Sequence, residues 1–199
     1  KGEGKSFVAL NISLALSTLD KKVLLIGADL RNPQLHKYLE TDKSIQGLTS
    51  YLHNINFDWK AAIINKFENL PHHHTLLTGI IPPNATQLLA NGNFEKIISE
   101  AKKDYDYIVI DTAPTLLVTD TLLLSHLADA VLYICRSNFT EKEILNYPKE
   151  LIKDGKLKNV GLVINSVGIN ARYHYGYTYK YGYSYNYGYG YGYASTNED

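Results

Sequence analysis

The body of the chain alternates short, continuous apolar runs with longer segments whose apolar positions recur at helical spacing. Five runs predict strands, over residues 22–26, 75–78, 107–110, 130–135 and 160–164. Continuous runs of this kind are typical of strands buried on both faces. Helical spacing predicts helices over residues 6–19, 84–90, 94–103, 119–127 and 140–153, with residues 44–70 forming helix and loop. This alternation predicts an α/β fold with a doubly wound, mostly parallel sheet.

The pattern changes after residue 171, where every second residue from Tyr173 to Tyr193 is tyrosine and half of the residues between are glycine. Strict alternation can also be interpreted as a β-strand. However, the stretch is longer than an ordinary strand and offers no aliphatic side chain for a core. We therefore expect one domain over residues 1–171 and a disordered, tyrosine-rich tail over residues 172–199.

Composition narrows the class of protein. The 199 residues include 20 basic and 20 acidic side chains, and a formal net charge of zero argues against a nucleic-acid binder. The apolar runs are too short to span a bilayer, and no secretory signal pattern opens the chain. A single cysteine excludes an intramolecular disulfide framework and fits a reducing compartment.

The first six residues, K-G-E-G-K-S, end in the last three positions of the phosphate-binding motif G-x-x-x-x-G-K-[ST]. Gly2, Glu3 and Gly4 would form a loop whose backbone N–H groups surround phosphates at the start of a helix. Lys5 would neutralise phosphate charge, and the Ser6 hydroxyl would bind Mg²⁺. The alternative is a charged, flexible terminus that matches the motif by chance.

The first glycine of that motif would lie two residues before Lys1. Since a phosphate loop of this type follows a strand, we expect a central strand of the sheet to lie outside residues 1–199. We also expect these residues to belong to a longer polypeptide.

Two further segments each end an apolar strand with a carboxylate. Asp29 follows the strand predicted over residues 22–26, and Asp111 follows the strand over residues 107–110. Ligand groups collect at the carboxyl ends of strands in doubly wound sheets, where both carboxylates would hold Mg²⁺ beside the phosphate loop. A single aspartate at such a place more often caps a helix or a turn. The phosphate-binding motif followed by two strands that each lead to an aspartate, in this order, favours nucleotide binding.

These motifs together resemble the cytoplasmic kinase domain of the bacterial tyrosine kinases (the BY-kinase family), which is similar to the MinD/ParA-type ATPases. The resemblance lies in G-E-G-K-S at residues 2–6, A-D-L-R-N-P at 28–33, G-I-I-P-P-N at 79–84, I-V-I-D-T-A-P at 108–114 and the terminal tyrosines. It implies a P-loop NTPase fold and ATP-dependent autophosphorylation of the tail, with ATP and Mg²⁺ as cofactors.

The resemblance also implies roles for individual residues. Lys5, Asp29 and Asp111 are the expected catalytic residues, and Ser6 joins the two aspartates at the metal. Asn165 would contact adenine or else cap a turn. Arg31 and Asp120 would support the phosphate or metal site by contacting its ligands, or Asp120 would cap the helix that follows the strand over residues 107–110. The expected phosphoacceptors are Tyr173, Tyr175, Tyr177, Tyr179, Tyr181, Tyr183, Tyr185, Tyr187, Tyr189, Tyr191 and Tyr193.

The family's setting implies the partners. The first is a second copy of the chain, which would be phosphorylated in trans within a homo-oligomer. The second is a membrane-embedded polysaccharide co-polymerase, as part of the same polypeptide or as a separate protein. The third is a tyrosine phosphatase. The location would be the cytoplasmic face of the bacterial inner membrane, and the process served would be capsule or exopolysaccharide synthesis and export. No nucleic acid is expected as a partner.

The sequence departs from the family pattern at Gly27, where the D-x-D-x-R motif usually has its first aspartate. Two other functions therefore stay open: a MinD/ParA-like ATPase without kinase activity, and a catalytically decayed adaptor that binds through its tyrosine tail. The three histidines at residues 72–74 are interpreted as a solvated turn before the strand at Thr75, rather than as a metal site.

Overall fold

The computed structural model describes residues 2–114 and 119–168, so the tyrosine tail expected over residues 172–199 lies outside the described residues. At the centre of the main sheet, β1 (Val23–Gly27) pairs in parallel with β3 (His73–Leu76) on one side and β4 (Tyr107–Asp111) on the other. The short β2 (Ile63–Ile64) adds an antiparallel edge, which gives the order β2-β3-β1-β4. A second, parallel sheet joins β5 (Val131–Arg136) to β6 (Val160–Asn165).

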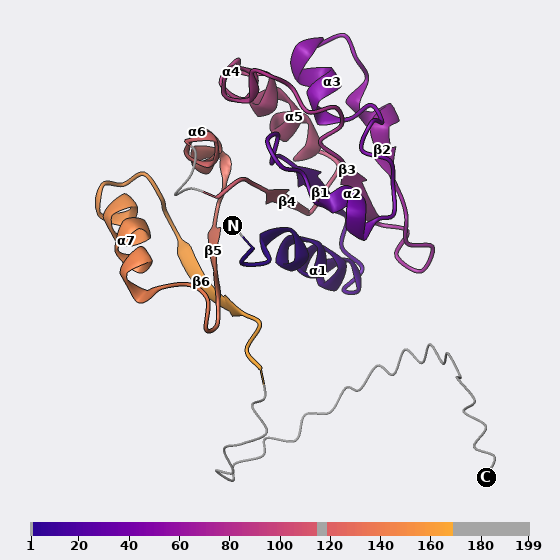
Figure 1. Cartoon of the computed structure of the whole chain (residues 1–199). Helices are drawn as coiled ribbons and strands as arrows, with labels where there is room; N and C mark the ends of the chain where they lie inside the picture. Colours follow the sequence, from indigo (N-terminus) through magenta and orange to yellow (C-terminus); the bar gives the residue numbers. More distant parts are fainter. Residues whose placement is uncertain (1, 115–118, 169–199) are drawn as a thin grey trace, which may run out of the picture. The chain divides into compact units, whose positions relative to one another are not determined.

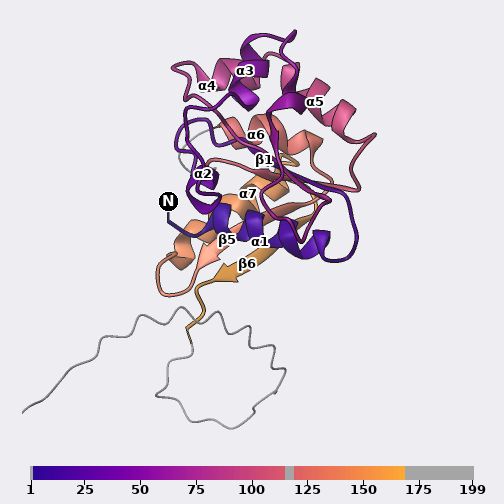
Figure 2. The same ribbon diagram turned by 90° about the vertical axis from the view of Figure 1, so that its right-hand side faces the viewer.

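Helices cover both faces of the main sheet, as a doubly wound fold requires. On one face lie α1 (Lys5–Ser17) and α2 (Leu35–Tyr38), and on the other lie α3 (Leu48–His53), α4 (Ala85–Leu89) and α5 (Asn93–Ala101) (Figures 1 and 2). Side chains of β1 alternate between these layers: Leu25 packs with α1 and α2, while Leu24 and Ile26 pack with α3, α4 and α5. All of β1 is buried, which explains its continuous apolar run.

The remaining elements follow the predicted pattern closely. The helix expected over residues 119–127 is α6 (Asp120–Leu124) continued by the 3₁₀ helix η2 (Ser125–Leu127). The helix expected over residues 140–153 is η3 (Lys142–Leu145) followed by α7 (Asn146–Lys153). The segment 44–70 contains α3, η1 (Trp59–Ala62) and β2. Sequence patterning did not predict α2 or β2, because four- and two-residue elements are too short to show a period.

The interpretation of residues 72–74 as a solvated turn is wrong for two of the three histidines. The strand begins at His73, which is fully buried, and His74 Nδ1 lies 2.8 Å from the Tyr105 hydroxyl. The Ser13 hydroxyl donates to the Leu10 carbonyl, so its oxygen accepts the Nε2–H of His73 at 2.8 Å. A partner on α1, 60 positions away, therefore draws His73 into the core.

Within residues 2–114 and 119–168, no helix combines the length and the hydrophobicity that crossing a membrane requires.

A candidate nucleotide and magnesium site

The phosphate-binding loop has the backbone that its glycines predict. Gly2 and Gly4 both adopt positive φ angles, 89° and 91°, which other L-residues rarely adopt. The first backbone bond of α1 runs from the Val8 N–H to the Gly4 carbonyl at 2.9 Å. The loop therefore leads directly into the positive end of a thirteen-residue helix, the arrangement that binds phosphate.

Two residues at the carboxyl ends of β5 and β6 hold this loop from outside. The side-chain amide of Asn165 donates to the Glu3 carbonyl at 2.8 Å, and the Arg136 guanidinium donates to the Gly2 carbonyl at 3.3 Å. Arg136 also lies over the Phe139 ring, 5.1 Å from its centroid. The Asn165 amide thus acts on the loop backbone, a contact that neither sequence interpretation of Asn165 included.

Lys5 is partly exposed, and its ammonium group forms a 3.2 Å ion pair with the Glu3 carboxylate. Glu3 lies in the loop and Lys5 is the first residue of α1, so the ion pair holds the ammonium group beside the loop. A lysine in this position is available to neutralise phosphate oxygens by a small change in its side-chain torsions.

Asp111 is almost completely buried, at 3% exposure. Burial raises its pKa to about 6, and the negative charge of Asp29 pushes it in the same direction. A hydrogen bond from Ser6 and the charge of Lys5 act oppositely and lower that pKa. Ser6 is therefore hydrogen-bonded to Asp111, and the charges of Asp29 and Lys5 lie close enough to act on the pKa of Asp111.

Asp29 reaches the same edge of the sheet from β1. The register pairs Gly27 with Asp111, and the Ala28 N–H donates to the Asp111 carbonyl at 2.8 Å. Beyond that point, Asp29 Oδ1 accepts the backbone N–H groups of Arg31 and Asn32 at 3.1 and 2.9 Å. One carboxylate oxygen therefore shapes the loop that carries Asp29.

These residues fit a magnesium-bound nucleotide. A hydroxyl and two carboxylates are the hard oxygen donors that Mg²⁺ prefers, and Mg²⁺ completes its shell with water and phosphate oxygens. Asp111 is costly to bury as an anion without a cation nearby, so a bound cation would stabilise it. No cluster of three or more histidine, cysteine or acidic residues in the described ranges forms a metal site of its own.

Arg31 and Asp120, expected to support the site, form a direct ion pair. The Arg31 Nε donates to Asp120 Oδ2 at 2.6 Å, and Thr86 donates to Asp120 Oδ1 at 2.7 Å. Burial alone would raise the pKa of Asp120, but these bonds outweigh it and leave that pKa below its ordinary value. The same contact raises the pKa of Arg31.

Gly27, the departure from the family motif, lies at the end of β1 in a tightly packed place. A Cβ atom there would lie 3.0 Å from Thr78 Oγ1 and 3.2 Å from the Thr78 backbone nitrogen. The Thr78 hydroxyl also donates to the Gly27 carbonyl at 2.8 Å. The neighbouring β3 segment therefore fills the space that a side chain at residue 27 needs.

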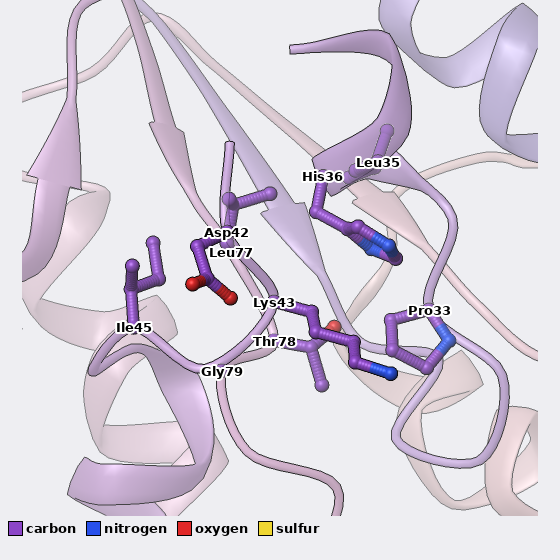
Figure 3. A pocket seen from close by; sticks show the side chains of 9 residues that line it. All are labelled: Pro33, Leu35, His36, Asp42, Lys43, Ile45, Leu77, Thr78 and Gly79. Atoms are coloured by element: carbon purple, nitrogen blue, oxygen red, sulfur yellow. The ribbon is translucent and has the colours of Figure 1, made fainter. Parts of the chain in front are cut away.

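A small cavity of about 10 Å³ lies beside the Asp29 loop, close to Pro33, His36, Lys43 and Thr78 (Figure 3). That volume accommodates about one water molecule.

The structure thus brings Lys5, Ser6, Asp29 and Asp111 together at one edge of the sheet, with Gly2, Glu3, Gly4 and Asn165 forming the adjoining loop and its anchor. Arg31 and Asp120 meet beside them, whereas the eleven tail tyrosines lie outside the described residues. Sequence reasoning missed Thr86 and the loop contact of Arg136. In the sequence, Thr86 could have been noticed as a hydroxyl residue just after the G-I-I-P-P-N motif, and Arg136 as a basic residue at the end of a predicted strand.

Comparisons with known proteins identify the relatives of this chain. The family described as "AAA domain" matches residues 1–143. The chain is 33% identical over 167 residues to the tyrosine-protein kinase CpsD of Streptococcus agalactiae, a match covering 84% of this chain and 71% of that kinase.

Two solved structures share the fold. The kinase domain of the Escherichia coli tyrosine kinase ETK superposes with a TM-score of 0.79 at 24% identity, over 91% of this chain and 69% of that one. The septum site-determining protein MinD of Pyrococcus horikoshii, solved with Mg-ADP, gives a TM-score of 0.65 at 23% identity, over 84% and 67%. On its motifs, site geometry and sequence relatives, the chain belongs to the family of bacterial tyrosine kinases.

Proposed function

We propose that the chain is an ATP-dependent tyrosine autokinase whose substrate is its own C-terminal tyrosine cluster. The observation that carries this proposal is the convergence of Asp111, Asp29, Ser6 and Lys5 beside a glycine-rich loop, in a chain that ends in eleven regularly spaced phenols. An ATPase that only drives assembly has no chemical need for such a tail.

Each residue of the site has its own role in phosphoryl transfer, a reaction that depends mainly on positioning the reactants and on neutralising their charge. The backbone of Gly2, Glu3 and Gly4 binds the phosphates, and Lys5 neutralises their negative charge. Ser6, Asp29 and Asp111 would hold Mg²⁺. When bound, the metal ion would supply positive charge that neutralises the transferred phosphoryl group.

The acceptor is activated by Asp29. A free phenol has a pKa near about 10 and is a weak nucleophile at neutral pH. As the tyrosine oxygen forms its bond to the γ-phosphorus, the bond from that phosphorus to the β-bridging oxygen breaks and ADP leaves. The phenolic proton passes to the Asp29 carboxylate. Asp29 suits this role because Oδ1 is engaged by two backbone N–H groups, so the carboxylate is held in one orientation.

Phosphorylation changes the charge of the tail from neutral to strongly negative. Arg172 and Lys180 balance Glu198 and Asp199 in the unmodified tail. Each phosphate adds about −1.5 to −2 charges, and alternate residues of an extended chain lie roughly 7 Å apart, within one Debye length. We infer that copies engage tail to active site when unmodified and separate as phosphate accumulates.

In the cell, we propose that this cycle regulates capsule or exopolysaccharide synthesis and export. The enzyme would work at the cytoplasmic face of the inner membrane with a membrane-embedded co-polymerase, and a tyrosine phosphatase would reverse its action. The support is the association of the family with such systems. Sedimentation before and after ATP treatment tests the separation of copies; an unchanged mass would contradict it.

The decisive experiment is a phosphotyrosine map by mass spectrometry after incubation with Mg-ATP. Phosphate should appear on the tail of the unaltered protein and be absent from Lys5→Met. Lys60→Met is the control, since Lys60 forms an exposed ion pair with Asp104 away from the site. Unchanged labelling of Lys5→Met would overturn the proposal. ADP production without phosphotyrosine would indicate an ATPase, and no binding of ATP would indicate an adaptor.

A further inference from the structure

The proposed function gives no role to the G-I-I-P-P-N segment at residues 79–84, yet the structure shows where it leads. The segment ends at Asn84, and α4 starts at the next residue, so the second residue of that helix is Thr86. The Thr86 hydroxyl donates to Asp120 Oδ1 at 2.7 Å and accepts from Arg31 Nη2 at 2.8 Å. One hydroxyl therefore joins two charged groups that lie 89 positions apart in the sequence.

The ion pair at the centre of this contact has a demanding geometry. Arg31 donates to both oxygens of Asp120, from Nε at 2.6 Å and from Nη2 at 3.3 Å. The Asp120 side chain is 3% exposed, whereas Arg31 is 47% exposed. A two-point, charge-assisted contact to a buried carboxylate fixes direction as well as distance. An ordinary surface ion pair fixes neither the direction nor the distance between its two side chains.

Each side of the pair continues to one of the two carboxylates assigned to the metal. On the first side, the Arg31 and Asn32 N–H groups bind Asp29 Oδ1, so immobilising Arg31 also immobilises Asp29. On the other side, Asp120 begins α6, and the neighbouring Thr121 hydroxyl donates to the Ala113 carbonyl at 2.5 Å. Ala113 is two residues beyond Asp111, so the contact extends to the end of β4.

We propose that Arg31, Thr86 and Asp120 form a carboxylate clamp, a set of positioning residues that fixes Asp29 relative to Asp111. The clamp rests on the proposed function, in which these two aspartates hold Mg²⁺ with Ser6. Mg²⁺ requires near-octahedral ligands at about 2.0–2.1 Å, so small errors in carboxylate placement weaken binding. The pairing of β1 with β4 ends at Gly27 and Asp111, and the backbone bond from Ala28 to the Asp111 carbonyl extends it by one residue. Asp29 lies beyond it, in a loop that needs a second anchor.

The clamp is tested first in the metal-free protein, by amide hydrogen exchange of Arg31 and Asn32. The variants are Thr86→Val, which keeps the side-chain shape, Arg31→Lys, which removes the forked geometry, and Asp120→Asn. We expect about tenfold faster exchange at these two amides, the effect of one lost hydrogen bond, with β1 amides unchanged. Asp104→Asn is the matched control, since it removes the acceptor of an exposed 2.7 Å ion pair.

The second measurement compares binding of a fluorescent ADP analogue with and without Mg²⁺. The clamp variants should need about tenfold more Mg²⁺ for half-maximal effect, while metal-free affinity for the analogue stays unchanged. Unchanged exchange together with unchanged Mg²⁺ dependence would overturn the clamp. An equal loss of affinity with and without Mg²⁺ would also overturn it and make Arg31 a phosphate ligand.

These readouts separate the clamp from the kinase proposal. Absence of phosphotyrosine in the unaltered protein contradicts the proposed function, but exchange and Mg²⁺-dependent binding still decide the clamp. Should Asp120→Asn fail to fold because it leaves Arg31 without its carboxylate, Thr86→Val carries the test, because it leaves both charges in place.

Discussion

The side-chain amide of Asn165 donates a 2.8 Å hydrogen bond to the backbone carbonyl of Glu3, and so attaches the end of β6 to the phosphate-binding loop. A Cβ atom at Gly4 would lie 2.1 Å from the same amide nitrogen, which shows how closely the two segments approach. The second sheet thus contributes to the site by shaping the loop.

Asn165→Ala should therefore weaken the binding of every nucleotide to a similar extent, by about five- to tenfold, the cost of one hydrogen bond. The measurement is titration calorimetry with ADP, GDP and tripolyphosphate. Asn159→Ala is the matched control, because Asn159 makes the same kind of bond, to the Asp129 carbonyl at 2.8 Å, at the other end of the same strand pair. A loss confined to ADP would instead assign Asn165 to the adenine.

Gly27→Asp, which introduces the carboxylate usual in the family, should destabilise the fold and leave phosphotyrosine formation no higher. The new Cβ atom approaches Thr78 to 3.0–3.2 Å, and overpacking of this kind costs about 1–3 kcal/mol. Urea unfolding of the variant measures the cost. Adding Thr78→Ala should recover part of it by removing the hydroxyl contact. A variant of unchanged stability with higher activity would contradict the packing argument.

Asp111→Asn should abolish Mg²⁺-dependent nucleotide binding and yet make the metal-free protein more stable at neutral pH. The reason is that the amide removes a buried charge that the protein tolerates for its function. We expect a gain of about 1–2 kcal/mol in the free energy of unfolding, measured with urea. Asp106→Asn serves as the control, because Asp106 is exposed just before β4 and an asparagine oxygen there can still accept the Lys22 N–H. Equal destabilisation by both substitutions would show that Asp111 has a structural role only.

His73 should make the protein sensitive to mild acid. Burial lowers its pKa from 6.5 to about 4, and the nearby His74 adds to the effect. Its Nε2–H is bound to Ser13, and its Nδ1 has no hydrogen-bond partner among the described residues, so a second ring proton would be buried without an acceptor.

Between pH 6.5 and 4 the unfolded chain therefore binds more protons at this position than the folded chain, and stability falls as the pH falls. The expected loss between about pH 7.5 and pH 5 is about 2 kcal/mol, measured by urea unfolding. His73→Gln keeps a donor for Ser13 but does not titrate, so it should lose correspondingly less. His36 and His74, whose pKa values are also lowered, are present in both proteins, so the comparison isolates the titration of His73 together with its interaction with His74. Identical losses would exclude His73 as the cause.

The sequence by itself determined the longer helices and strands and the backbone of the phosphate-binding loop. The continuous apolar run of β1 follows from its burial on both faces, and a similar run predicts the strand that ends at Asp111. The glycines of the loop follow from its positive φ angles. Such requirements act on neighbouring residues, so they are visible in a linear pattern.

Only the tertiary structure decided which distant side chains meet. Because β1 lies between β3 and β4, the loop of Asp29 faces Asp111, Thr78 fills the space at Gly27, and His73 reaches Ser13. The carboxylate clamp of Arg31, Thr86 and Asp120 likewise joins three segments that are far apart in the sequence. The local pattern of each segment does not indicate that it contacts the other two. Strand order and the packing of helices on the two faces set these partners, since both arise from long-range contacts that local periodicity does not encode.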